Sequence, residues 1–146
     1  MECWNILPTF HLGELTSARE NSKNILVFSS LIRNFAVEKK EIMRRPEIVE
    51  QIKQAIQKTE PTATAILYGS EARGDARADS DIDELILLDG DKRDFRREDK
   101  ISGELYNLEL NTGVLISPMI MLRKQWENRP FKTPFYINVV NEGITL

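Results

Sequence analysis

The stretch from residue 64 to residue 88 constrains the fold more than any other part of this sequence. A short apolar run, Thr64–Tyr68, stops at Gly69-Ser70, and a second apolar run, Ile82–Leu88, follows a polar stretch. Both runs have the length and composition of buried strands. Together with the amphipathic helix predicted over Pro46–Lys58, they indicate an α/β domain with a mixed sheet.

Further elements are predicted after these two strands. Leu105–Leu110 alternates apolar and polar residues, as a half-buried strand does, and Val114-Leu115-Ile116 is predicted to be another strand after a turn. Helices are predicted around Leu122–Asn128 and over Thr133–Asn141, whereas the charged stretch Asp91–Lys100 is expected to be a loop. We therefore expect the α/β (α+β) class, with a mixed central β-sheet flanked by helices.

The first 42 residues differ from the rest of the chain. Apolar residues in 1–42 keep no period, whereas regular patterning begins at Met43 and continues to the C-terminus. A chain of 146 residues has room for one domain of ordinary size. We interpret residues 1–42 as an N-terminal extension that is poorly ordered or not native, and residues 43–146 as the functional domain. A sharper hypothesis is that the native chain starts at Met43.

Composition removes several classes of function. The 20 Lys+Arg and 23 Asp+Glu residues give a net charge of −3, so no basic field attracts nucleic acid. With only Cys3 and His11, the chain has no set of residues for a disulfide framework, a Cys/His zinc site or a Cys-His nucleophile pair. There is no secretory signal pattern, and the longest N-terminal apolar stretch, Ile25–Phe28, is too short for a membrane span. We expect a cytoplasmic protein that binds no membrane.

The break after the first strand has the features of an anion site. A strand that turns on Gly69-Ser70 into a short helix presents unpaired backbone N–H groups and a hydroxyl at the helix N-terminus. Gly69 would let a phosphate approach the backbone closely, and Arg73, one turn later, could add a forked positive group. This segment is therefore a candidate phosphate site.

Two carboxylates begin the second strand. Asp81 and Asp83 are two residues apart, so both should point to one side, and Ile82 and Leu85 are expected to point to the other. Paired carboxylates repel each other unless a cation lies between them, and oxygen ligands suit Mg²⁺. A two-ion site for phosphoryl transfer also needs a carboxylate from a neighbouring strand. Glu109 on the predicted strand is the candidate for this third ligand and for the proton acceptor.

Each of these features has a simpler structural interpretation. A Gly-Ser pair after a strand is usually a turn, an Asp-x-Asp pair is more often a solvated strand start, and Glu109 could lie on the exposed face of a strand. Glu84 is interpreted as a solvated or ion-paired strand residue that points away from Asp83. The conjunction favours the functional interpretation, because all the features fall in one strand–turn–helix–strand unit in the order that phosphate chemistry requires.

These residues resemble a known signature. Gly69-Ser70, ten further residues and then Asp81-Ile82-Asp83 are similar to the motif of the minimal nucleotidyltransferases (MNT) of the DNA polymerase β superfamily. Arg73-Gly74 and Ser80 also match the fuller pattern, Gly-Ser-x-Ala-Arg-Gly followed by Ser-Asp-Ile-Asp. The resemblance extends over about Arg44–Leu146 and implies a polymerase β-like nucleotidyltransferase fold.

The resemblance also implies an activity. Family members move a nucleoside monophosphate from a Mg²⁺-bound NTP to a hydroxyl, and some are antitoxins that adenylylate a HEPN-type toxin on tyrosine. Residue by residue, the nucleotide would be held by Gly69, Ser70, Arg73 and Ser80. Two Mg²⁺ ions would be held by Asp81, Asp83 and Glu109.

This chain departs from the family at two positions. The third carboxylate is usually Asp, where Glu109 is one methylene longer, and Glu84 stands where an apolar residue is common. We expect AMP transfer from ATP to a partner protein. The alternatives are a non-catalytic nucleotide- or partner-binding module with the same fold and a small-molecule (antibiotic) nucleotidyltransferase.

Overall fold

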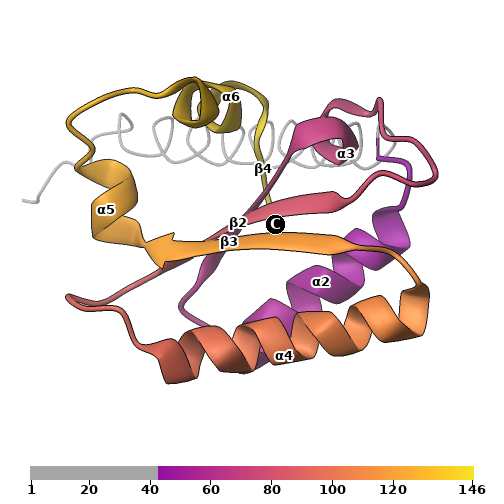
Figure 1. Cartoon of the computed structure of the whole chain (residues 1–146), viewed down its shortest axis with the longest axis horizontal. Helices are drawn as coiled ribbons and strands as arrows, with labels where there is room; N and C mark the ends of the chain where they lie inside the picture. Colours follow the sequence, from indigo (N-terminus) through magenta and orange to yellow (C-terminus); the bar gives the residue numbers. More distant parts are fainter. Residues whose placement is uncertain (1–42) are drawn as a thin grey trace, which may run out of the picture. The chain divides into compact units, whose positions relative to one another are not determined.

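The computed structural model describes residues 43–146, so the predicted N-terminal extension, with Cys3 and His11, lies outside the described residues. The elements follow one another along the chain as shown in Figure 1: α2 (Pro46–Thr59), β1 (Thr64–Tyr68), α3 (Gly69–Arg73), β2 (Ile82–Leu88), α4 (Phe95–Thr112), β3 (Ile116–Leu122), α5 (Arg123–Glu127), α6 (Pro134–Glu142) and β4 (Ile144–Thr145). No helix in this part of the chain is long and apolar enough to cross a bilayer.

The four strands form one mixed sheet in the order β3-β2-β1-β4. β1 is antiparallel to both β2 and β4, whereas β2 and β3 are parallel. Parallel neighbours cannot be joined by a tight turn and need a crossover, which is usually a helix. Here α4 is that crossover, and it returns the chain to the edge where β3 starts. The predicted α/β class with a mixed sheet flanked by helices is confirmed.

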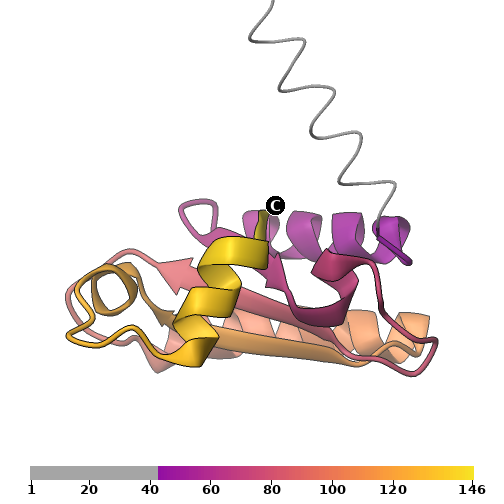
Figure 2. The ribbon, with the colours of Figure 1, turned by 90° about the horizontal axis from the view of Figure 1, so that it is seen from above.

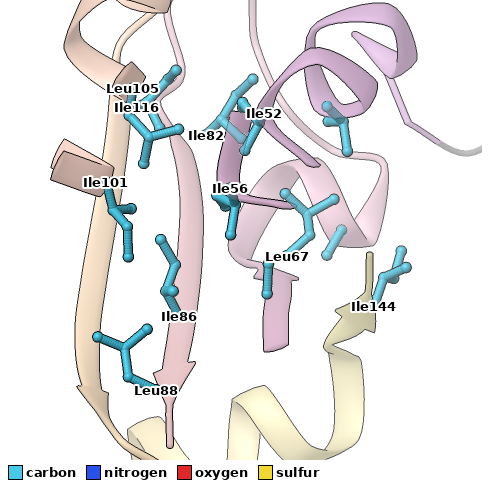
Figure 3. Packing of buried hydrophobic residues seen from close by; sticks show 13 residues of the cluster. Ile52, Ile56, Leu67, Ile82, Ile86, Leu88, Ile101, Leu105, Ile116 and Ile144 are labelled. Atoms are coloured by element: carbon cyan, nitrogen blue, oxygen red, sulfur yellow. The ribbon is translucent and has the colours of Figure 1, made fainter. Parts of the chain in front are cut away.

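One face of the sheet is covered by α2 and α4, which lie side by side along the lower side of Figure 1. The main core fills the space between these helices and the strands, and Figure 3 shows its side chains meeting from both layers. Its buried members include Ile52, Ile56, Leu67, Ile82, Ile86, Leu88, Ile101, Leu105 and Ile116. Each fully buried side chain of this size contributes about 1.5–3 kcal/mol to folding, so this face provides most of the stability.

The opposite face carries a smaller cluster under α5 and α6. Leu85 and Leu87 from β2 pack there against Trp126 of α5 and Val139 of α6. Figure 2 shows α6 in front of the strands, with α4 fainter behind them. Because α5 and α6 are short, this face is covered only in part.

The strand predicted over Leu105–Leu110 is wrong, because these residues belong to α4. Asp94 caps the N-terminus of α4 by accepting a hydrogen bond from the backbone N–H of Arg96 (3.0 Å), and Gly113 ends it in the left-handed conformation. The apolar residues that contact the core follow the helical period of 3.6 residues rather than a period of two: Ile101, Leu105 and Leu108.

Other boundaries also shift. The charged stretch Asp91–Lys100, predicted to be a loop, contains the first turns of α4. The short strand predicted at Val114-Leu115-Ile116 is β3, which begins at Ile116 and continues to Leu122. The helices predicted around Leu122–Asn128 and Thr133–Asn141 are confirmed as α5 and α6.

Candidate active site

Asp81 immediately precedes β2 and Asp83 is its second residue, on the face that α2 and α4 leave uncovered. Asp83 is paired with Tyr68 of β1 on one side and with Ser117 of β3 on the other. It shares its face with Leu85, because side chains two residues apart point the same way. The expectation that Leu85 points away from the two aspartates is therefore wrong.

The two carboxylates are close enough to affect each other. Burial raises the pKa of Asp83, and the negative charge of Asp81 raises it further, whereas Arg73 lowers it. Both side chains are only partly buried. A divalent cation would relieve this repulsion, and carboxylate oxygens on a half-open face are the donors that Mg²⁺ prefers. The residues present therefore fit a hard divalent cation.

Gly69 connects the turn after β1 to this carboxylate pair. Its φ of 73° is in the left-handed region, and a Cβ placed there would lie 2.5 Å from Oδ2 of Asp83. Glycine is required on both counts, because another side chain would strain the backbone and collide with the carboxylate. The observation places the predicted anion turn directly beside the predicted metal ligands.

The residues predicted to hold the nucleotide surround this turn. Ser70 is the second residue of α3, a single-turn helix. Arg73, at its end, is engaged by two carboxylates: it donates to Asp75 (3.3 Å) and to Glu142 at the end of α6 (3.1 Å). The Ser80 hydroxyl accepts a hydrogen bond from the backbone N–H of Arg77 (2.9 Å) and so fixes the turn before Asp81.

A buried ion pair, which was not predicted from the sequence, links the turn at Gly69 to the segment that carries Asp81. Arg45, just before α2, contacts the fully buried Glu71 of α3 through Nη2 (2.8 Å) and Nε (3.0 Å), and its backbone N–H donates to the same carboxylate. Its Nη1 also donates to the carbonyl oxygen of Ser80 (2.8 Å). Arg45 thus ties the phosphate turn to the residue that precedes Asp81. The Arg-Arg-Pro start of the helix gave no signal for this role.

Glu109 is not part of the carboxylate cluster. It lies on α4, and its Oε1 accepts a hydrogen bond from the backbone N–H of Ile116 (2.7 Å), which fixes the end of the helix to the start of β3. Within residues 43–146, no group of three or more His, Cys, Asp or Glu side chains is placed to hold a metal ion. The prediction that Glu109 completes the site from a neighbouring strand is wrong, because the strand on which it depended is a helix.

Ser117 occupies the position that was assigned to a third carboxylate. It is opposite Asp83 on the strand next to β2, and its hydroxyl donates to Oδ2 of Asp81 (3.2 Å). Sequence reasoning could have found it only from the parallel register of β2 and β3. That register becomes visible once α4 is recognised as a crossover.

Glu84 was expected to be solvated or ion-paired, and this expectation is wrong. It is fully buried on the main-core face, paired in register with Leu67, and neither carboxylate oxygen has a hydrogen-bond partner among the described residues. Burial, and secondarily the charge of Asp83, raises its pKa to about 8. Glu84 does point away from the site, as expected from the alternation along β2.

Comparison with models of protein families adds an independent finding. The model described as "Nucleotidyltransferase domain" matches residues 49–144, which extend from α2 to β4 and include the turn and both aspartates. Among curated proteins, none matches the sequence significantly.

Proposed function

The chain belongs to the nucleotidyltransferase domain family, and we propose that it moves AMP from ATP to a hydroxyl of a partner protein, as antitoxins of HEPN/MNT pairs do. One observation supports this proposal above the others. The space that a side chain at position 69 would fill is taken by the Asp83 carboxylate. A phosphate cradled by the turn would therefore lie next to the metal ligands, as transfer from an NTP requires.

The described residues have separate tasks in this reaction. The backbone at Gly69 and the Ser70 hydroxyl would hold the triphosphate, and Asp81 and Asp83 would hold Mg²⁺. The ion would supply electrostatic stabilisation of the charge that develops on the transferred phosphoryl group. The acceptor oxygen forms a bond to the α-phosphorus while the bond to the bridging oxygen breaks, so pyrophosphate leaves. Glu109 lies on α4 and outside any cluster with the two aspartates in residues 43–146, so the proton of the acceptor hydroxyl would pass to water on the open face.

The site lies on a face of the sheet that is covered only in part, which would leave room for a macromolecular acceptor. Met119 follows Ser117 by two residues on β3, so it points to the same side as the aspartates, and it is 40% exposed. A single exposed apolar side chain is ordinary on a protein surface, so the support for a protein acceptor is the partly open position of the two aspartates, which a large partner could reach. HEPN-type toxins are the partner class that we propose.

Label transfer from α-labelled ATP in extract of the native host tests this function. We expect a labelled protein band with wild type and Mg²⁺, and none with the double variant Asp81→Asn/Asp83→Asn. Asp79→Asn is the matched control, because it removes an exposed carboxylate two residues earlier and should retain labelling. Absence of label with all four NTPs, while nucleotide binding is intact, would refute transfer to a macromolecule.

A non-catalytic nucleotide-binding module is the second candidate. It is favoured by one finding, which is that Asp81 and Asp83 have no third carboxylate beside them in the described part of the chain. Such a module would bind Mg²⁺ and ATP without releasing pyrophosphate. Measuring pyrophosphate in parallel with ATP binding separates the two candidates.

A further inference from the structure

The strand next to Asp83 carries a hydroxyl at the position that faces the carboxylate pair. β2 and β3 are parallel neighbours (Figure 1), and their register sets Asp83 opposite Ser117. Directly opposite residues in paired strands point to the same face. Ser117 therefore shares the open face with Asp83, and its Oγ lies 3.2 Å from Oδ2 of Asp81.

No other element fills this position in the described chain. On the β1 side, the partner of Asp83 is Tyr68, and the chain then turns at Gly69. The carboxylate of Glu109 is bound to the backbone of Ile116, at the far end of α4 from its N-cap. β1 brings Tyr68 opposite Asp83, whereas β3 brings Ser117 opposite Asp83 and also within hydrogen-bond distance of Asp81 (3.2 Å).

We propose that Ser117 is a positioning residue of the nucleotidyltransferase site, which holds the Asp81 carboxylate in place for a divalent cation from the position where a third carboxylate would otherwise stand. This inference rests on the proposed function. A hydroxyl that donates to a metal-binding carboxylate fixes its orientation while adding no charge, and such outer contacts strongly influence metal affinity. The proposed site thus has two carboxylate ligands, Asp81 and Asp83, and Ser117 orients the carboxylate of Asp81.

Mn²⁺ binding to the full chain, followed by electron paramagnetic resonance without nucleotide or acceptor, tests this role. Ser117→Ala should weaken Mn²⁺ binding about tenfold, within the range found when an outer hydrogen bond to a metal ligand is removed. Ser117→Thr keeps the hydroxyl and should retain wild-type affinity. Ser117→Asp adds a third carboxylate facing the pair and should tighten binding. Ser102→Ala on the exposed side of α4 is the control and should change nothing.

The outcomes separate this inference from the proposed function. Wild-type affinity in Ser117→Ala, an equal loss in Ser117→Thr, or weaker binding in Ser117→Asp would each overturn the role of Ser117. Thermal unfolding of every variant shows whether a loss comes from misfolding, and Ser117→Thr then remains the deciding variant. If wild type binds no Mn²⁺, both proposals fail. If the Mn²⁺ series behaves as expected but no label is transferred, only the catalytic function fails.

Discussion

Glu84 is the residue whose environment departs furthest from what its chemistry favours. Its carboxyl is buried among the strands and helices of the main core, without a hydrogen-bond partner in residues 43–146. Burying an ionised carboxylate without a partner is costly, and the group keeps its proton instead. Glu84 stands at a position that would suit an apolar residue, and its carboxyl therefore makes the stability of the domain depend on pH.

Replacing Glu84 by Gln should remove that dependence. In the folded chain the pKa is about 8, whereas in the unfolded chain it is near the ordinary value of 4.5. Between these values the folded state retains a proton that the unfolded state releases. The free energy of unfolding of wild type should therefore fall as pH rises from about 4.5 to about 8, by up to roughly 1.4 kcal/mol per pH unit. Glu84→Gln should lack this slope.

Urea denaturation with a metal chelator, at several pH values, measures the difference between the two proteins. The control is Glu104→Gln, which changes an exposed carboxylate of α4 and should leave the pH profile as in wild type. Parallel profiles for wild type and Glu84→Gln would show that Glu84 ionises alike in both states.

Substitution of Gly69 has two expected effects, a collision with Asp83 and backbone strain, and a second glycine allows them to be measured separately. Gly69→Ala should abolish Mn²⁺-dependent ATP binding, because its Cβ would meet Oδ2 of Asp83 at 2.5 Å. Gly113→Ala is a close match, with φ of 69° against 73° and no atom within 4 Å of the new Cβ. Both variants should lose about 1 kcal/mol or more from backbone strain. Calorimetric titration that shows equal loss of ATP binding in both would refute the close approach at Gly69.

At the scale of elements, the link between α2 and α3 depends on the pair formed by Arg45 and Glu71. Arg45→Ala would keep the backbone hydrogen bond to Glu71 but leave its buried carboxylate without a positive partner, so we expect a loss of about 3–5 kcal/mol in the free energy of unfolding. Lys124→Ala breaks the exposed pair with Asp91 and should lower the free energy of unfolding far less than Arg45→Ala does. Urea denaturation compares them, and similar small losses would show that the buried pair does not anchor α3.

The elements that carry the motif could be predicted from the sequence, whereas α4 could not. Strands β1 and β2 are short buried runs with clear ends, so their apolar composition identifies them. In α4, Leu108 and Leu110 on either side of Glu109 imitate a period of two, although Leu110 is exposed. The signals that favour the helix are Asp94 at its start and Gly113 at its end.

That misassignment hid Ser117 as a neighbour of the two aspartates. Gly69, Asp81 and Arg73 do lie near Asp83, because all four belong to one strand–turn–helix–strand unit. Ser117 is 34 positions beyond Asp83 along the sequence, and only the strand register brings the two together. Arg45 reaches Glu71 from before α2 in the same way. Contacts of this kind depend on tertiary packing and leave no local pattern.

At the scale of the whole molecule, the two faces of the sheet have different tasks. The face under α2 and α4 holds the larger hydrophobic cluster, and the face under α5 and α6 holds the smaller one and the aspartates. Glu84 and Asp83 are adjacent, yet they belong to opposite faces. Changes in the main core should therefore act on stability, and changes around Asp83 on binding.

The arrangement of both faces within residues 43–146 predicts how much of the chain the domain needs. A chain that starts at Met43 keeps Arg45 and every element of the sheet, so it should unfold cooperatively with the melting temperature of the full chain and bind ATP equally well. A chain that starts at Pro46 keeps the same elements but lacks the partner of Glu71. It should be destabilised about as much as Arg45→Ala, by roughly 3–5 kcal/mol. Calorimetry of the full chain and the two shortened chains tests this prediction. A lower melting temperature for the chain that starts at Met43 would show that the preceding residues contribute to the fold. Equal stability of the two shortened chains would show that the Arg45–Glu71 pair does not stabilise the N-terminal end of the domain.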